Sequence, residues 1–217
     1  MILLLILNYI LIIFLQRILP KLVGKINEIV RNILFFFPYL LPFIYIHDLS
    51  YSKLDVPNYI VFFAVIMCLM CVAINYWNNK TLFNFELLNY FPRKTKTSLI
   101  FILYELIGSS VFEEIFYRQY VFNVSNTYLN AYYSIFITST LFILTHLLNR
   151  RFLKQNSFST LVIFSIFSIS LTLLYLVYNN ILLNIFVHLC FNSPLILLNT
   201  LTTDWKKKND QHNQKRD

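Results

Sequence analysis

Long apolar runs are the feature that most constrains how this chain can fold. A transmembrane helix needs about 20 consecutive apolar residues, because it crosses about 30 Å of hydrocarbon at about 1.5 Å per residue. Hydrophobic residues make up 58% of the 217 residues and charged residues only 13%, a composition that a soluble globular domain does not have. The pattern predicts an all-α polytopic membrane protein with about seven transmembrane helices, at residues 2–19, 32–47, 58–77, 98–124, 128–148, 158–178 and 180–202.

The Lys and Arg residues predict how these helices are oriented. Seventeen of the 18 lie in or beside connections between predicted helices, and the counts along the chain are four, one, four, none, three, none and five. The positive-inside rule then places the N-terminus outside and the C-terminus in the cytoplasm of a cell of bacterial character, with the short 125–127 connection outside. The net charge of +8 reflects this topology and contact with the lipid bilayer. A nucleic-acid partner is not needed to explain it.

The predicted helices fall into three parts. Residues 1–97 hold the first three transmembrane helices and a cytoplasmic loop, residues 98–203 hold a core of four helices, and residues 204–217 form a basic cytoplasmic tail expected to be disordered. No inverted repeat and no pair of Gly- or Pro-broken helices is visible in the sequence, which argues against a transporter.

Several polar residues remain inside the predicted helices, where an ionisable side chain costs several kcal/mol and a functional role is the default expectation. Glu114 and Arg118 are four residues apart, so they share a helix face and can pair. Glu113 is rotated by about 100° from Glu114 and is left available as a general base. The alternative for this cluster is that it only braces the helix bundle. The polar residues are Glu105, Glu113, Glu114, Arg118, His146, Asn184, His188 and Asn192.

Two further helices carry polar side chains at helical spacing. Phe142 and His146 lie one turn apart, and Asn184, His188 and Asn192 follow one another at intervals of four residues. Together with Glu113 they can form one cluster in the bundle interior. Such a cluster can activate a water and hold an oxyanion, or it can bind a metal. The small residues Gly108, Ser109 and Ser110 are expected to let helices approach closely.

Taken in order, these motifs resemble the signature of the CAAX-protease and bacteriocin-processing (CPBP/Abi) family of intramembrane endopeptidases. The motifs are Glu113-Glu114-x-x-x-Arg118, Phe142-x-x-x-His146 and His188-x-x-x-Asn192, and the resemblance covers about residues 98–200. It implies that Glu113 and His146 activate the attacking water, that His188 and Asn192 stabilise the tetrahedral intermediate, and that Glu114 and Arg118 hold the shape of the site.

The resemblance leaves the cofactor and the substrate open. The mechanism is either metal-free and glutamate-dependent or uses a divalent metal such as zinc, in which case the ligands would be Glu113, His146, His188 and Asn192. The substrate is a peptide or lipidated protein, either a peptide pheromone, a bacteriocin precursor or a prenylated (CAAX) protein. The rival function is a non-catalytic bacteriocin-immunity or regulatory membrane protein that retains the motif residues for packing.

The depths of two motif residues conflict in the predicted helices. A straight helix that begins at Ser98 places Glu113 about 22 Å from the cytoplasmic side, whereas His146 lies near the cytoplasmic end of the helix 128–148. Either the first of these helices begins later, with residues 98–108 partly in the interface, or the helices tilt and the second extends past Leu148.

Overall fold

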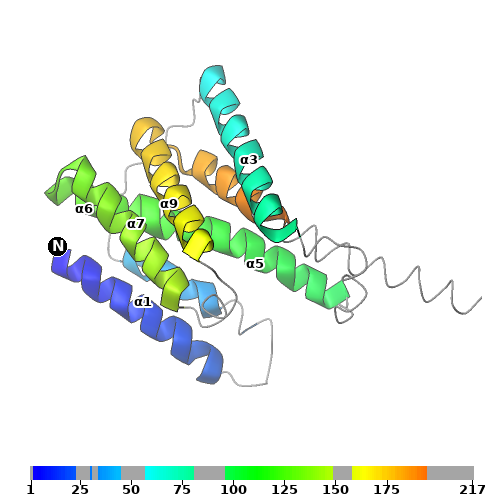
Figure 1. Ribbon diagram of the computed structural model, residues 1–217. Coiled ribbons are helices and arrows are strands. Elements are labelled where there is room, and N and C mark those ends of the chain that lie inside the picture. Colours follow the sequence, from blue (N-terminus) through cyan, green and yellow to red (C-terminus); the bar gives the residue numbers. More distant parts are fainter. Residues whose placement is uncertain are drawn as a thin grey trace, which may run out of the picture. The chain divides into compact units, whose positions relative to one another are not determined.

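All regular secondary structure in the described part of the chain is helical (Figure 1). The computed structural model describes residues 2–22, 30, 34–44, 57–80, 96–148 and 158–194. Three helices among them are long and apolar enough to cross a membrane, at Ile2–Leu19, Ala131–Leu148 and Leu161–Tyr178, with mean hydropathies of 2.4, 1.5 and 2.3. They coincide with three of the predicted helices and fit a helical membrane protein. The full set of seven remains a prediction.

The described helices belong to two compact units. Residues 1–58 and 108–185 form the first unit, and residues 59–107 and 186–217 form the second. The elements, in chain order, are α1 (Ile2–Leu22), η1 (Phe37–Ile44), α3 (Asn58–Asn79), α5 (Lys96–Glu114), η3 (Ile115–Phe122), α6 (Asn123–Tyr128), α7 (Ala131–Leu148), α9 (Phe158–Tyr178) and a further helix, Ile181–Pro194.

The described helix in the second predicted span is short. Its apolar part runs from Leu34 to Ile44, and η1, which makes up most of it, is a 3-10 helix that contains Pro42. Proline has no N–H to donate, so a regular α-helix is not favoured here. The described segment falls short of the about 20 residues that cross a bilayer, and the flanking parts of the predicted span 32–47 lie outside the described residues.

The fourth predicted helix is continuous from Lys96 to Tyr128, through α5, η3 and α6. Its middle section, η3, is a π-helix that begins directly after Glu113 and Glu114 and contains Arg118. In a π-helix each N–H bonds to the carbonyl five residues earlier; such segments are rare and occur often at functional sites. The sequence pattern did not predict it.

The turn after this helix is later in the chain than predicted. Residues 125–127 are helical because they belong to α6, where the Thr127 hydroxyl donates to the Asn123 carbonyl (2.8 Å). The backbone becomes extended at Leu129 (φ −131°, ψ 174°), and the side chain of Asn130 accepts a hydrogen bond from the N–H of Tyr133 (3.1 Å) at the start of α7. The prediction of a turn at 125–127 is therefore wrong, since the reversal lies at residues 129–130.

Within the first unit, α1 runs alongside α7 (Figure 1). The Tyr9 hydroxyl donates to the carbonyl of Leu141 (3.1 Å). Near the other end of α1, the guanidinium of Arg17 donates to the carbonyl of Leu148 (3.0 Å), which is one of the C-terminal carbonyls of α7 that lack a partner within the helix. The first predicted helix therefore supports the helix that carries His146.

Gly108 marks a close approach to the helical segment before η1. A Cβ atom added at Gly108 would lie 2.8 Å from Cε2 of Phe36, and the Phe36 ring is itself stacked on Phe112 with centroids 5.7 Å apart. This contact confirms that Gly108 allows helices to approach closely.

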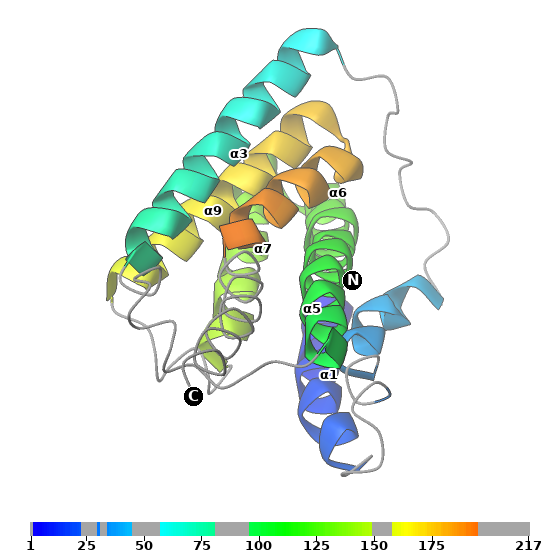
Figure 2. The ribbon, with the colours of Figure 1, turned by 90° about the vertical axis from the view of Figure 1, so that its right-hand side faces the viewer.

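The chain reverses after α9, and residues 181–185, which begin the next helix, lie beside α9 (Figure 2). Asn179 has a positive φ of 46°, a conformation that asparagine tolerates better than most residues. Asn180 caps the new helix by accepting from the N–H of Leu183 (3.0 Å). One turn further on, the side chain of Asn184 donates to the carbonyl of Leu171 on α9 (2.8 Å).

Candidate active site

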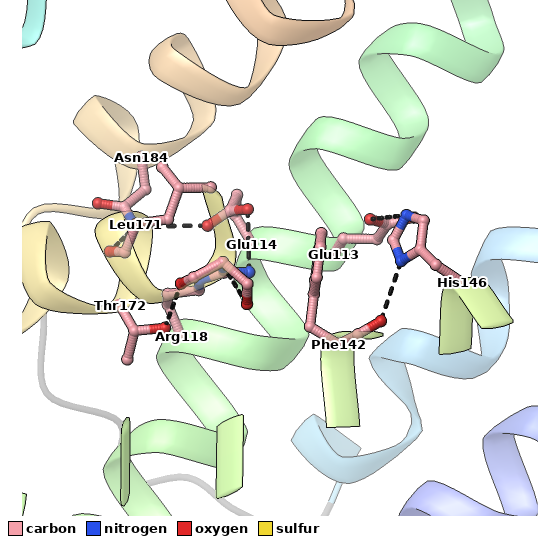
Figure 3. Close-up of polar contacts among 9 residues, drawn as sticks. Glu113, Glu114, Arg118, Phe142, His146, Leu171, Thr172 and Asn184 are labelled. Carbon is pink, nitrogen blue, oxygen red and sulfur yellow. Dashed lines mark hydrogen bonds and ion pairs between the residues drawn. The ribbon is translucent and has the colours of Figure 1, made fainter. Parts of the chain in front are cut away.

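Glu114 and Arg118 form a buried ion pair. Arg118 NH1 lies 3.1 Å from Glu114 Oε1, and neither side chain is exposed (Figure 3). The second carboxylate oxygen of Glu114 accepts a longer hydrogen bond from Asn184 Nδ2 (3.4 Å). The pair predicted from the four-residue spacing is therefore confirmed, and it includes a residue from the helix Ile181–Pro194.

Arg118 joins three helices of the first unit. Its NH2 group donates to the carbonyl of Ser168 on α9 (3.3 Å) and lies 3.5 Å from the hydroxyl of the same residue. Its guanidinium also lies 4.9 Å from the centre of the Phe142 ring on α7, within the range of a cation–π interaction. A buried charge needs such partners because desolvation is costly, so Arg118 connects η3 to both α7 and α9.

Glu113 faces His146 rather than the ion pair. Glu113 Oε2 and His146 Nε2 are 3.9 Å apart, with the two side chains 10% and 21% exposed (Figure 3). The Oε2 atom is buried and has no hydrogen-bond partner among the residues that the structure describes. The structure thus brings together two of the four residues that the motifs predicted to be catalytic.

A backbone contact orients the His146 ring. Nδ1 lies 2.9 Å from the carbonyl oxygen of Phe142, and the ring centroids of the two residues are 4.5 Å apart. A carbonyl oxygen can only accept, so Nδ1 must carry the proton of this hydrogen bond. In the neutral imidazole, Nε2 is then an acceptor directed towards Glu113.

This geometry suits a bridging water. A separation of 3.9 Å is too long for a direct hydrogen bond. Two acceptors at this distance, a carboxylate oxygen and Nε2, can each receive one hydrogen from a water placed between them. A water held in this way lies beside two bases that can take up its proton.

Glu113 and His146 lie close together although the predicted helices placed them at different depths in the membrane. The helix that carries Glu113 begins at Lys96, so a later start does not explain the mismatch, and α7 is described as far as Leu148. Glu113 and His146 nevertheless lie within 3.9 Å of each other.

Residues that the sequence analysis did not single out lie next to this pair. The hydroxyl of Tyr117 is hydrogen-bonded to Oγ1 of Thr145, which also lies 3.1 Å from the hydroxyl of Tyr9. A signal was available in the sequence, because Tyr117 follows Glu113 by four residues and Thr145 directly precedes His146.

His188 and Asn192 lie on the helix Ile181–Pro194, one turn apart, and fall in the second unit. His188 is 3% exposed and Asn192 is half-buried. Their position relative to Glu113 and His146 remains a prediction.

The donor set around Glu113 does not by itself fit a zinc site. Catalytic zinc takes three protein ligands, whereas Glu113 and His146 supply two in the first unit. Among the described residues, no group of three or more His, Cys, Asp or Glu side chains is arranged to hold a metal.

The described helices fit a helical membrane protein. Residues 95–194 match the family model described as type II CAAX prenyl endopeptidase Rce1-like, a range that contains all three motifs. This match confirms that the segment 95–194, 100 of the 217 residues, resembles the CAAX-protease family. No curated protein and no solved structure matches the chain.

Proposed function

We propose that this protein is an intramembrane endopeptidase in which Glu113 and His146 activate a water for attack on a peptide bond. The observation that carries the proposal is the 3.9 Å separation of Glu113 Oε2 and His146 Nε2, with His146 Nδ1 committed to the Phe142 carbonyl. Both facing atoms are then acceptors, and a water between them is oriented and close to a base. The family match supports the same reaction class.

The reaction can be written with this chain's own groups. The water oxygen forms a bond to the carbonyl carbon of the substrate, its proton moves to Glu113, and the carbonyl electron pair moves onto the oxygen. His188 and Asn192 are proposed to donate hydrogen bonds to that oxyanion. The carbon–nitrogen bond then breaks as the electron pair returns, and the proton held by Glu113 is delivered to the leaving amine.

Glu114 and Arg118 are proposed to hold this site in shape rather than to react. Their mutual ion pair and their contacts with Asn184, Ser168 and Phe142 occupy them within the bundle. Removing one partner of a buried pair leaves an uncompensated charge, so their loss is expected to affect folding as well as turnover.

We propose as substrate a peptide or lipidated protein that reaches the site from the membrane. The family description names prenylated CAAX proteins, and the peptide pheromone and the bacteriocin precursor are the other two candidates. A prenylated substrate would place its lipid among the apolar helices, whereas a pheromone or a bacteriocin precursor would bind through its own peptide chain.

The test uses purified full-length protein in lipid nanodiscs. A farnesylated CAAX peptide, the same peptide without its lipid, and a peptide with a bacteriocin leader are incubated with it, and the products are identified by mass spectrometry. Cleavage of any of them by the wild type but not by Glu113→Gln is expected. Glu105→Gln, the same change on the same helix but outside the motifs, is the matched control and is expected to cleave.

The alternative, a non-catalytic immunity or regulatory protein, predicts a different result. Wild type and Glu113→Gln would then both leave every peptide intact, and both would confer the same biological phenotype in cells. Equal cleavage by wild type and Glu113→Gln would also contradict the proposal, because the general base would lie elsewhere.

A further inference from the structure

A hydrogen bond between η3 and α7 lies beside the Glu113–His146 pair and is not used by the proposed chemistry. Tyr117 follows Glu113 by one turn, and its hydroxyl bonds to Oγ1 of Thr145, the residue before His146. The Tyr117 side chain is fully buried, and its ring packs edge-on against Phe142 with centroids 5.2 Å apart. This bond therefore connects the helix of the carboxylate to the helix of the imidazole.

The directions of these hydrogen bonds show that Tyr117 does not donate its proton to Glu113. The Thr145 hydroxyl donates its single proton to the Leu141 carbonyl (3.0 Å), so its oxygen accepts from Tyr117. The Tyr117 proton is therefore committed to Thr145 and is not available to Glu113.

The side chains around this bond come from two more elements of the first unit. Tyr9 on α1 lies 3.1 Å from the Thr145 hydroxyl, and the ring of Tyr39 on η1 packs against the Tyr117 ring with centroids 6.2 Å apart. Tyr39 is also fully buried. Buried polar networks whose members are satisfied rigidify the elements that they join. The Tyr117–Thr145 bond is the member whose residues lie one helical turn after Glu113 and directly before His146.

We propose that Tyr117 is a positioning residue, which through its hydrogen bond to Thr145 fixes the distance between the Glu113 carboxylate and the His146 imidazole. A gap of 3.9 Å accepts one bridging water. A shorter gap would press two acceptors together and leave no room for the water, whereas a longer gap would lose one of the water's hydrogen bonds. Two helices that can slide past each other need a fixed contact to hold such a gap.

This proposal rests on the proposed function, because the distance between Glu113 and His146 matters for holding the water that the two residues activate. Tyr117→Phe removes the hydroxyl and keeps the ring. Thr145→Val removes the hydroxyl at nearly the same shape, whereas Thr145→Ser keeps it. Tyr120→Phe is the matched control, because Tyr120 lies on the same π-helix and its hydroxyl accepts a hydrogen bond from Asn8 of α1 (2.6 Å).

The kinetic experiment measures kcat and KM for a cleaved peptide with each variant in nanodiscs, together with its unfolding temperature. Tyr117→Phe and Thr145→Val are each expected to lower kcat about 10-fold with KM unchanged, because small misplacements of reacting groups are costly. The double variant should be no slower than the slower single variant, and Thr145→Ser should be close to wild type. Tyr120→Phe should keep the wild-type kcat even if its unfolding temperature falls as far as that of Tyr117→Phe.

A spectroscopic readout separates failure of this proposal from failure of the proposed function. The chain has four histidines, and the nitrogen resonances of His146 can be assigned by their loss in His146→Gln. Tyr117→Phe and Thr145→Val are expected to change the chemical shift of Nε2 and its pH dependence, while Tyr120→Phe leaves both unchanged. If the wild type cleaves no peptide, the proposed function fails, but the His146 resonances still show whether Tyr117 positions the imidazole. Unchanged His146 resonances in Tyr117→Phe, or equal changes in Tyr120→Phe, would overturn the proposal.

Discussion

The guanidinium of Arg118 lies 4.9 Å from the centre of the Phe142 ring, and the carbonyl of the same phenylalanine binds Nδ1 of His146. One residue of α7 thus contacts the buried ion pair through its side chain and the imidazole through its backbone. This relationship supports the proposed role of Glu114 and Arg118 in holding the shape of the site, because Phe142 contacts both Arg118 and His146.

Breaking the ion pair should cost stability. Glu114→Gln leaves Arg118 fully buried without its charge partner, and a loss of about 3–5 kcal/mol in the free energy of unfolding is expected. Unfolding in bicelles of Glu114→Gln, Arg118→Met and the double variant forms a double-mutant cycle. The double variant should be destabilised by less than the sum of the singles. Additivity within about 0.5 kcal/mol would show that the two side chains do not interact.

Filling the space at Gly108 should also destabilise the fold. In Gly108→Ala the new Cβ would meet Cε2 of Phe36 at 2.8 Å, and the stacking of Phe36 on Phe112 limits how far the ring can move. Overpacking of this kind costs about 1–3 kcal/mol. Combining the change with Phe36→Leu, which removes the clashing ring edge, should recover part of the loss in unfolding temperature. If Gly108→Ala is as stable as wild type, the close approach is not required.

Helical periodicity alone predicted the features that depend on one helix. The four-residue spacing of Glu114 and Arg118 gave their ion pair, and the rotation of Glu113 away from Glu114 gave a carboxylate on another face. These relations are local, so they can be read without knowing which helices pack together.

Helical periodicity alone could not predict the contact between Glu113 and His146. The two residues are 33 positions apart, and they were placed in one cluster because both are polar residues inside predicted membrane helices and because their motifs resemble those of one family. The π-helix was missed because apolar patterning does not distinguish it from an α-helix. The turn was placed too early, at the gap between two predicted helices, whereas residues 125–127 are helical and the Thr127 hydroxyl donates within the helix to the Asn123 carbonyl. Tyr117 and Thr145 were missed because each reads as an ordinary residue of an apolar helix.

The orientation in the membrane can be tested with reporter fusions. The Lys and Arg distribution predicts that a reporter fused after Asp217 is active in the cytoplasm. A reporter inserted between Leu129 and Asn130, where the structure places the turn, should be active outside. The opposite activity of both fusions would invert the predicted topology.

Asn192→Asp tests the proposed oxyanion site. The change is nearly isosteric but places a negative charge where the oxyanion would form, so turnover should fall by about 100-fold or more with little change in the unfolding temperature. If Asn192 is instead a metal ligand, Asn192→Asp should keep its turnover, because aspartate can also bind a metal. A chelator in the same cleavage assay separates these outcomes, and for a site built from side chains alone we expect no inhibition.

The most direct test of the central claim is a kinetic double-mutant cycle of Glu113→Gln and His146→Gln, with cleavage of one peptide as the readout. An amide can donate and accept hydrogen bonds but cannot take up the proton of the water. Each single variant should therefore lose about 100-fold or more in kcat. Because both residues act on one water, the double variant should be no slower than the slower single variant. Wild-type cleavage by either single variant, or losses that multiply in the double variant, would contradict a water shared by Glu113 and His146.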